Sequence, residues 1–451
     1  MDNCAVALAR GAAAGFDGVS WRAQHHLNPG VKKREVFGWA MYDFANSGYT
    51  TVVLTAVFSA YFVGVVAGQA EWATFAWTLA LSISYAIVML TMPSIGALAD
   101  LRAAKKRYLA LTTIGCVAAT AALALVGPGQ VVLAMVLIIF SNAFYSYGES
   151  LSASFLPELA RRDSLGTVSG WGWSFGYFGG MLALGVSLGF VLWAQGQGMS
   201  AAQFVPVTML FTALIYGVAA VATFALLTER AVPQPAALRE SGFKASLARL
   251  RATWLNARRY KDFMWLLLCG VFYQGGVAVT VTLAAIYAEQ VIGFRQAETM
   301  VLIFVLNLAA AAGAFGFGFF QDKIGHKLAL GITLAGWILT CVIAALSTTK
   351  GEFWWAAAIA GACMGSSQSA GRAMAGMFAP QKQLAEFYGL WTFATRLASI
   401  IGPLTYGAIT WATGGNQRIA ILSTTVLFVA GMIALIPINM ARGRAAAAAA
   451  E

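Results

Sequence analysis

Charged residues are scarce in this sequence. Only 10% of its 451 residues are Asp, Glu, Lys or Arg, whereas soluble domains carry about 25%. Acidic residues are the rarer sign, with 18 Asp and Glu against 29 Lys and Arg. Because 59% of the residues are hydrophobic, this scarcity excludes an ordinary soluble protein and indicates that lipid is the main solvent of the chain.

Residues that build catalytic and metal sites are scarce too. The three histidines, His25, His26 and His326, lie between apolar runs, so we expect neither a metal cluster nor a Ser–His–Asp hydrolase site. The five cysteines show no CxxC spacing and are expected to be small buried hydrophobic residues. No GxxxxGK[ST] phosphate loop is present, which excludes ATP-driven transport by this chain alone. We therefore expect no enzyme activity, no metal and no cofactor.

The chain instead holds twelve long apolar runs, most of them long enough to cross a bilayer core of about 30 Å. They cover residues 36–66, 73–98, 108–126, 131–156, 168–195, 204–227, 263–290, 297–320, 328–346, 353–378, 384–411 and 418–440. This pattern predicts an all-α polytopic membrane protein whose twelve transmembrane helices form two six-helix bundles.

The division of the chain follows from these runs. We expect an N-terminal segment (1–35) without a signal peptide, a first bundle (36–227), a basic linker (228–262), a second bundle (263–440) and a tail (441–451). The linker is either an amphipathic helix on the anionic membrane surface or a solvated connection. Of the 29 Lys and Arg residues, 24 lie in segments that share a side with both termini, so both termini are expected to be cytoplasmic in a cell inner (plasma) membrane.

An internal repeat relates the two bundles. GALADLRAAKKR (96–107) follows the second run and GFFQDKIGHK (318–327) follows the eighth, and each places Asp four residues after Gly. Asp100 and Asp322 are 222 residues apart. The spacing indicates a parallel repeat, as in transporters whose halves rock around a central site.

The first copy of this loop resembles G-x-x-x-D-[RK]-x-G-[RK]-[RK] of the major facilitator superfamily, with Ala103 where Gly is usual. The resemblance implies the fold of that superfamily and a loop that latches the outward-facing state. The residues expected to form this latch are Gly96, Asp100, Arg102 and Lys105, with Asp322 as a weaker second copy.

A narrower resemblance extends from the first run to the eleventh. YDFANSGY (42–49), LPEL (156–159), SGWGWSFGYFGG (169–180) and GSSQSAGRAMAGMFAP (365–380) together resemble the vacuole-effluxer-like branch of that superfamily. This branch contains fungal vacuolar amino-acid exporters, so the resemblance implies export of amino acids or similar zwitterions. FYQGG (272–276) departs from the branch, which has an acidic residue after the tyrosine. If that acid normally contributes to proton coupling, another residue must take this role in the present chain, or the role is absent.

Four charged residues lie well inside the runs, away from their ends: Asp43, Glu149, Arg372 and Arg396. Such charges are costly in a membrane and usually mark a pathway. Glu149 and Arg372 are 223 residues apart, hence equivalent in the repeat, and can meet as a gate, a static ion pair or a solute contact. Asp43 is expected to couple protons, since burial favours a neutral carboxyl group, or else to hydrogen-bond with Asn46. Arg396 could instead pair with Asp43.

Aromatic and amide side chains are expected to line the rest of a central cavity, although aromatic residues also serve packing and interfacial belts. The expected solute contacts are Asn46, Tyr49, Tyr145, Trp173, Tyr177, Tyr273, Gln274, Gln368 and Trp391. We predict a monomeric secondary transporter that exports a small polar solute, an amino acid or similar zwitterion, by proton-coupled alternating access. The alternatives are a lipid or amphiphile transporter and a transport-inactive receptor or scaffold. Expected partners are the solute, protons and membrane lipids, and nucleic acid is not one of them.

Overall fold

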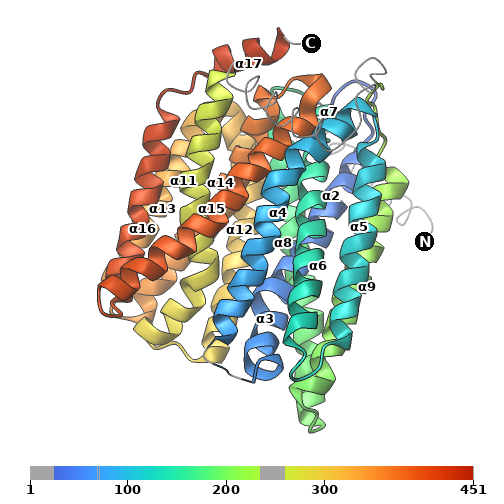
Figure 1. Ribbon diagram of the computed structural model, residues 1–451. Coiled ribbons are helices and arrows are strands. Elements are labelled where there is room, and N and C mark those ends of the chain that lie inside the picture. The colour runs from blue at the N-terminus through green and yellow to red at the C-terminus, as the bar shows by residue number, and fades with distance from the viewer. Residues whose placement is uncertain (1–24, 69, 71, 234–259, 450–451) are drawn as a thin grey trace, which may run out of the picture.

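The computed structural model describes residues 25–68, 70, 72–233 and 260–449, and this part of the chain is almost entirely helical (Figure 1). Within these residues, the extended backbone is limited to one isolated antiparallel bridge between Leu27 and Ala160. Most of the predicted basic linker falls on residues 234–259, outside the described residues. The prediction of an all-helical membrane fold is confirmed.

Twelve long helices of the described residues run along the molecule in two sets of six. The first set comprises α2 (Lys33–Tyr49), α4 (Ala73–Leu101), α5 (Lys105–Ala122), α6 (Val131–Ala153), α8 (Leu165–Gly196) and α9 (Ala201–Leu226). The second set comprises α11 (Lys261–Tyr287), α12 (Gln296–Ile324), α13 (His326–Leu346), α14 (Lys350–Phe378), α15 (Leu384–Ala412) and α16 (Gln417–Leu435). Two short helices, α7 (Leu156–Leu159) and α17 (Met440–Ala448), lie at one end of the bundle (Figure 1).

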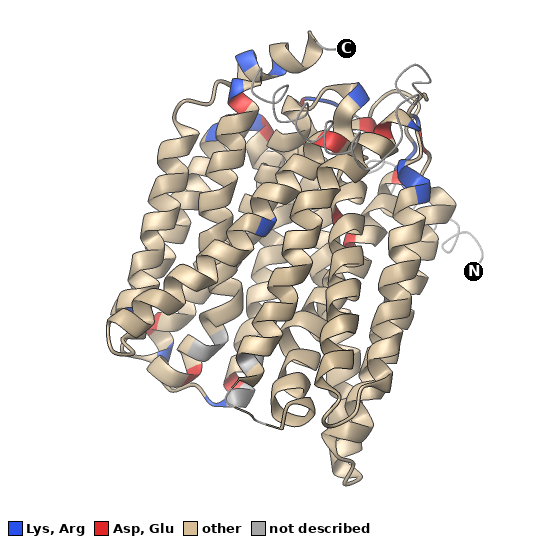
Figure 2. Cartoon of the chain, in the orientation of Figure 1, with Lys and Arg blue, Asp and Glu red and all other residues tan. Residues whose placement is uncertain are grey.

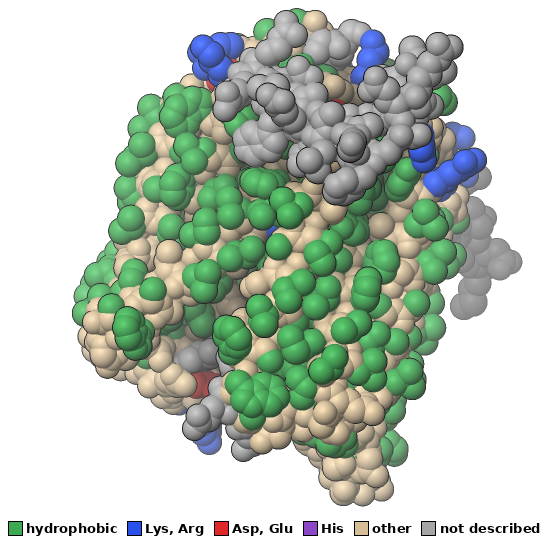
Figure 3. Space-filling view, viewed as in Figure 1, with side chains coloured by type: hydrophobic (Ala, Val, Ile, Leu, Met, Phe, Trp, Pro, Cys, Tyr) green, Lys and Arg blue, Asp and Glu red, His purple; other side chains and the backbone are tan. Residues whose placement is uncertain are grey.

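Ten spans among the described residues are long and apolar enough to cross a membrane. The exceptions are α14 and α15, which have 29 residues each but are diluted by small and polar side chains and by Arg372 and Arg396. Large hydrophobic side chains cover the outer surface of the helices in view (Figure 3). The two helices least like membrane spans are thus those that carry the embedded arginines.

The first span is not one continuous α-helix. Beyond α2 it continues as a π-helical segment (Thr50–Ala56), the short helix α3 (Phe58–Tyr61) and a second π-helical segment (Phe62–Val66). A run of β-branched residues starts at Thr50, whose hydroxyl donates to the carbonyl oxygen of Ser47 at 3.1 Å. Both features disfavour a regular α-helix, and π-helical turns are frequent at functional sites.

Most of the charged residues in view lie at the end of the bundle that carries α7 and α17, which is called here the basic end, and fewer lie at the opposite end (Figure 2). The opposite end is called the far end. At the basic end α17 is tied to the start of α11, because Arg442 pairs with Asp262 at 2.8 Å. The count of Lys and Arg predicts that this end faces the cytoplasm.

The two halves meet along α4 with α15 and along α8 with α12. Glycines permit the close approach. A Cβ atom on Gly170 would collide with the carbonyl oxygen of Ala314, and one on Gly389 would lie 2.8 Å from the Cα of Pro93. Both contacts lie in the part of the helices nearer the basic end, so the halves are packed together there without room for side chains.

Candidate functional site

Two ion pairs join the halves inside the bundle. Asp43 of α2 pairs with Arg372 of α14, with 2.6 Å between Oδ2 and Nη1. Glu149 of α6 pairs with Arg396 of α15. In each pair the first half supplies the acid and the second half supplies the arginine. The charges therefore neutralise one another only while these parts of the two halves are together.

This arrangement corrects the expected pairing. The prediction that Glu149 meets Arg372 is wrong, and so is the alternative that Asp43 meets Arg396. Helices α6 and α14 are equivalent in the repeat, but α14 packs against α8 while α6 packs against α15. The repeat predicts that two residues have similar depth, and it does not predict which neighbouring helix each side chain faces.

All three guanidinium nitrogens of Arg372 make hydrogen bonds. Arg372 donates from Nε to the hydroxyl of Ser169 at 3.0 Å and from Nη2 to the carbonyl oxygen of Ser169 at 2.7 Å. Its guanidinium carbon lies 4.8 Å from the ring centroid of Trp39 and 5.3 Å from that of Trp173. Only 12% of the Asp43 side chain is exposed. Such packing suits a pair that holds two helices in a fixed relation.

The Glu149–Arg396 pair is less completely surrounded. The guanidinium lies 5.5 Å and 5.8 Å from the ring centroids of Tyr85 and Tyr145, but its Nε has no hydrogen-bond partner. The nearby Ser146 hydroxyl is also buried without a partner. The Glu149 side chain is 34% exposed. The Glu149 carboxylate is therefore the more exposed of the two embedded acids.

An amide pair lies one turn from Arg372 towards the far end. Gln274 of α11 donates to Oε1 of Gln368 at 2.7 Å, and Gln368 donates back to Oε1 of Gln274 at 3.1 Å. Gln274 also donates to the hydroxyl of Tyr273 at 3.2 Å. Because each amide satisfies the other, a solute would have to supply equivalent hydrogen bonds to separate them.

Three other predicted contacts lie beside the ion pairs. Tyr145 faces Arg396, and Trp173 faces Arg372. Tyr177 lies next to Trp173, with 6.0 Å between ring centroids. The Nε1 of Trp173 is buried without a hydrogen-bond partner, so its N–H group is a donor that a ligand could use.

Asn46, Tyr49 and Trp391 lie away from both pairs. The side-chain oxygen of Asn46 accepts a hydrogen bond from the Tyr216 hydroxyl at 2.7 Å, inside the first half. Tyr49 bonds to the Ser141 hydroxyl at 2.8 Å. Trp391 is buried against glycines of α11 and α14. Tyr49 also stacks on Tyr145, with 5.1 Å between ring centroids, and so lies one ring away from Arg396.

Sequence reasoning missed several residues of the site. Ser169 and Trp39 both lie in stretches that the motifs or the first span had already marked, but nothing in their spacing connects them to an arginine. Tyr85 and Ser146 sit in apolar runs, and no pattern identifies them. They are found only once α4 and α6 are placed against α15.

The two repeated aspartates bind helix N-termini across the halves. Asp100 accepts a hydrogen bond from the backbone N–H of Glu386 at 3.0 Å, in the first turn of α15. Asp322 accepts from the backbone N–H groups of Gly166 and Thr167 at 3.0 Å and 2.7 Å, and from the Thr167 hydroxyl at 2.6 Å. A carboxylate is favourable at a helix N-terminus. Asp322, expected to be the weaker copy, has an additional hydroxyl donor.

The rest of the expected latch divides in two. Gly96 packs against the backbone of Ala385 across the halves. Lys105 instead pairs with Glu158 inside the first half, and exposed Arg102 donates to the Tyr108 hydroxyl at 3.2 Å. These contacts of Lys105 and Arg102 therefore fix the α4–α5 turn within its own half. Of the expected latch residues, Gly96 and Asp100 make the contacts across the halves.

We predict that Asp322→Asn opens the basic end more than Asp100→Asn does. A hydrogen bond to a charged group contributes about 1.5–3 kcal/mol, and Asp322 has the additional donor. Electron–electron resonance between spin labels at exposed Arg107 and Gln381 should show a larger long-distance population for Asp322→Asn. Exposed Asp163→Asn is the control. An equal or larger opening in Asp100→Asn contradicts the prediction.

The described start of the chain forms a strap at the same end. Asn28 donates to the carbonyl oxygen of Pro157 at 3.0 Å, which fixes residues 25–31 to the first half. The His26 ring lies 5.9 Å from the ring of Trp171 on α8 and 6.0 Å from that of Phe319 on α12. Since α8 and α12 belong to different halves, His26 covers the seam between them.

Comparisons with known proteins agree with this architecture. A protein of Bacillus subtilis (strain 168) named "Uncharacterized MFS-type transporter YxiO" is 27% identical over 408 residues, which cover 88% of this chain and 93% of that protein. The crystal structure of the human organic anion transporter MFSD10 matches with a TM-score of 0.71 and 15% identity, over 90% of this chain and 100% of that one. The E. coli fucose:proton symporter FucP matches with a TM-score of 0.65 and 17% identity, over 90% and 98%.

The two structural matches show the fold, and the sequence match assigns the family. The family described as "Vacuole effluxer Atg22 like" matches residues 59–448, which is most of the chain. Twelve long helices in two repeated sets are consistent with that match. This chain therefore belongs to the vacuole effluxer Atg22-like family of the major facilitator superfamily, and it is a multi-pass membrane transporter rather than an enzyme.

Proposed function

We propose that this transporter exports an amino acid or similar zwitterion in exchange for protons, by alternating access between its two halves. The observation that carries the proposal is the Glu149–Arg396 pair. It combines a partly exposed carboxylate with a guanidinium that has an unused donor, and it joins the two halves. A zwitterion carries the same two charges as this pair.

The chemistry of recognition follows from that match. The carboxylate of the solute binds the guanidinium of Arg396, whose planar fork suits a carboxylate. The ammonium group binds Glu149. Removing one member of a buried pair leaves an uncompensated charge, at about 3–5 kcal/mol. A zwitterion pairs with both members at once, so α6 and α15 can separate without leaving either Glu149 or Arg396 unpaired.

Protons act at the same place. Protonated Glu149 can no longer pair with the solute ammonium group, so a proton and a zwitterion compete for this site, as exchange requires. The sequence predicted that Asp43 couples protons. We assign this role to Glu149 instead, because the Glu149 side chain is 34% exposed and that of Asp43 is only 12% exposed. Asp43 and Arg372 are proposed to hold α2 and α14 together during the cycle.

Alternation of access requires the basic end to open. The bonds of Asp100 and Asp322 to helix N-termini close this end, and they break when the halves rock. If the protein lies in the plasma membrane with its basic end in the cytoplasm, the end closed by these bonds is the cytoplasmic one. A monomer is sufficient for this cycle, since both halves belong to one chain.

Transport by purified protein in liposomes tests the proposal. Uptake of radiolabelled alanine, phenylalanine or another zwitterion should be faster into acid-loaded vesicles, where protons leave as solute enters. Glu298→Gln at the far end is the matched control, because the Arg295 backbone N–H and the Lys350 ammonium hold the pKa of Glu298 at about 2. That carboxylate does not titrate between pH 5 and pH 8, so its removal should leave the pH response unchanged.

Three results would count against the proposal. Absence of flux across amino acids, sugars and organic anions favours a transport-inactive receptor or scaffold. Movement of lipid analogues alone favours a lipid transporter. Zwitterion flux that does not respond to the pH gradient contradicts proton coupling but still supports zwitterions as the solute class.

A further inference from the structure

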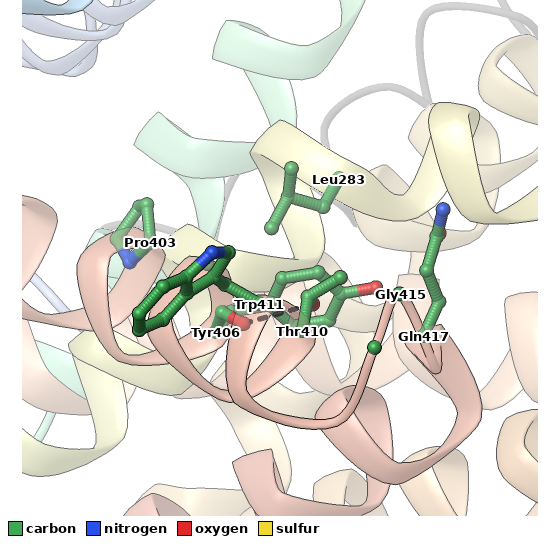
Figure 4. Close-up of a pocket in the computed structure, with 9 residues that line it drawn as sticks. Leu283, Pro403, Tyr406, Thr410, Trp411, Gly415 and Gln417 are labelled. Atoms are coloured by element: carbon green, nitrogen blue, oxygen red, sulfur yellow. Dashed lines mark hydrogen bonds between the residues drawn. The ribbon is translucent and has the colours of Figure 1, made fainter.

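A group that regulates the opening of the basic end has to contact both halves. The groove of about 620 Å³ at the far end does not, because Leu283 of α11 faces Pro403 and Trp411 of α15, all in the second half (Figure 4). The strap at the basic end does contact both halves. Its backbone is bonded to the first half, and the ring of His26 reaches Phe319 in the second half.

Backbone hydrogen bonds hold the strap to the first half. The N–H group of Asn28 donates to the carbonyl oxygen of Leu159 at 3.0 Å, and that of Arg161 donates to the carbonyl oxygen of His26 at 3.0 Å. The side chain of Leu27, between these two strap residues, is buried. The strap therefore moves together with α7 and α8, and it keeps His26 beside the start of α8.

The ring of His26 belongs to a cluster of three rings on the seam between α8 and α12. Trp171 and Phe319 are 6.3 Å apart between ring centroids, and His26 meets both of them edge to face. Asp322 lies three residues after Phe319 in α12, and its carboxylate is close enough to interact electrostatically with His26. A cation is attracted both by aromatic faces and by a carboxylate.

The hydrogen bonds of His26 show where an added proton goes. The hydroxyl of Ser164 donates to Oδ1 of Asp163 at 3.3 Å, so it accepts from Nδ1 of His26 at 3.0 Å. Nε2 is then the nitrogen that takes up a proton. Histidine changes its charge near neutral pH. Because the charged ring is attracted to Phe319 and Asp322 only while the halves are together, the closed end binds this proton more tightly, and a fall in pH favours closure.

The other charges near His26 leave this preference intact. The turn before α8 carries the charged residues Arg161, Arg162 and Asp163. Because this turn moves with the strap, its charges act equally on the open and the closed state. In the second half, Nε2 of His326 lies 3.3 Å from Oδ1 of Asp322, and exposed Lys323 follows Asp322 in α12. The charge of Lys323 is screened by water and salt. His326 is a second histidine that the test has to separate from His26.

We propose that His26 is a pH-dependent lock on the basic end, whose protonated ring holds α8 and α12 together. Acid in the compartment that this end faces therefore slows the opening of the transporter. The inference goes beyond the proposed function and requires only that the basic end opens. In the proposed exchange, protons enter the compartment that the solute leaves, so the lock limits further acidification of that compartment.

Electron–electron resonance between spin labels at Arg107 and Gln381 measures the opening at pH 8 and at pH 6. The background carries Asp100→Asn, which loosens the other seam and gives a measurable open population. It also carries Glu149→Gln, so that this acid does not contribute to the pH response. The open population should be about threefold smaller at pH 6 than at pH 8, as expected for a cation beside aromatic rings at a partly exposed site.

Two variants test whether the charge of His26 causes this difference. His26→Gln removes the ring and the charge, and His26→Phe keeps a ring in the cluster but cannot be protonated. Both should show the same open population at pH 6 and at pH 8. The matched control is His25→Gln, since His25 is the exposed neighbour in the strap and should leave the threefold difference unchanged.

The outcomes separate this inference from the proposed function. A response that persists in either His26 variant, or an open population that rises in acid, overturns the lock. Loss of the response in His26→Gln and His26→Phe, together with its retention in His326→Gln, supports it, and the reverse pattern assigns the titration to His326 and overturns it. If the lock is found but no zwitterion is transported, the proposed function fails and the inference stands.

Discussion

Glu149→Gln should abolish the response of transport to a pH gradient while solute exchange at equal pH continues. Glutamine can neither take up nor release a proton, so the increase in uptake rate that the gradient produces should be lost completely. Solute counterflow needs no net proton movement and should continue, at a raised KM because the amide cannot pair with the solute ammonium group.

The measurement is proton-driven uptake into liposomes between pH 5.5 and pH 8, together with counterflow in the same preparation. The wild-type rate should vary with pH, and the rate of the variant should be flat. Asp43→Asn, at the other pair, is the comparison that locates the coupling. If Asp43→Asn loses the pH response while Glu149→Gln keeps it, the coupling residue is Asp43 as the sequence suggested. Rates are compared per amount of folded protein, because each substitution also removes one member of an ion pair and lowers stability.

The second large effect is on stability. Arg372→Met should destabilise the protein by about 3–5 kcal/mol, because Asp43 is left as an enclosed charge without its partner. Arg396→Met should have a smaller effect, since the Glu149 side chain is 34% exposed and water can solvate its charge. Thermal unfolding in one detergent, followed by intrinsic fluorescence, ranks the two variants.

A double-mutant cycle tests the physical reason for this difference. Asp43→Asn combined with Arg372→Met removes both charges and should recover much of the stability that Arg372→Met loses. The coupling energy should be larger for this pair than for Glu149 with Arg396. Equal coupling energies would contradict the assignment of one pair to a structural role and the other to transport.

Much of this fold was predictable because a chain that crosses a bilayer must satisfy its backbone hydrogen bonds internally. Long apolar runs correspond to helices, and short basic segments mark their ends. Asp100 and Asp322 were found from an exact spacing, and each does lie at a helix N-terminus. The two long helices that are not apolar enough to count as membrane spans are α14 and α15, and these are the helices that carry Arg372 and Arg396.

The sequence did not predict which embedded acid pairs with which arginine. Residues related by the repeat share a depth, but which side chains meet depends on the packing of α14 against α8 and of α6 against α15. The additional hydrogen bond of Asp322 depends on one hydroxyl, that of Thr167, which no repeat predicts.

The amino-acid sequence alone determined the class of protein and the four embedded charges, and it predicted twelve long helices with an internal repeat, because these follow from composition and periodicity along one chain. Only the tertiary structure decided that Asp43 belongs with Arg372 and Glu149 with Arg396, and that one pair is enclosed while the other is partly exposed. The reason is that exposure and pairing are set by neighbouring helices that lie hundreds of residues away in the chain.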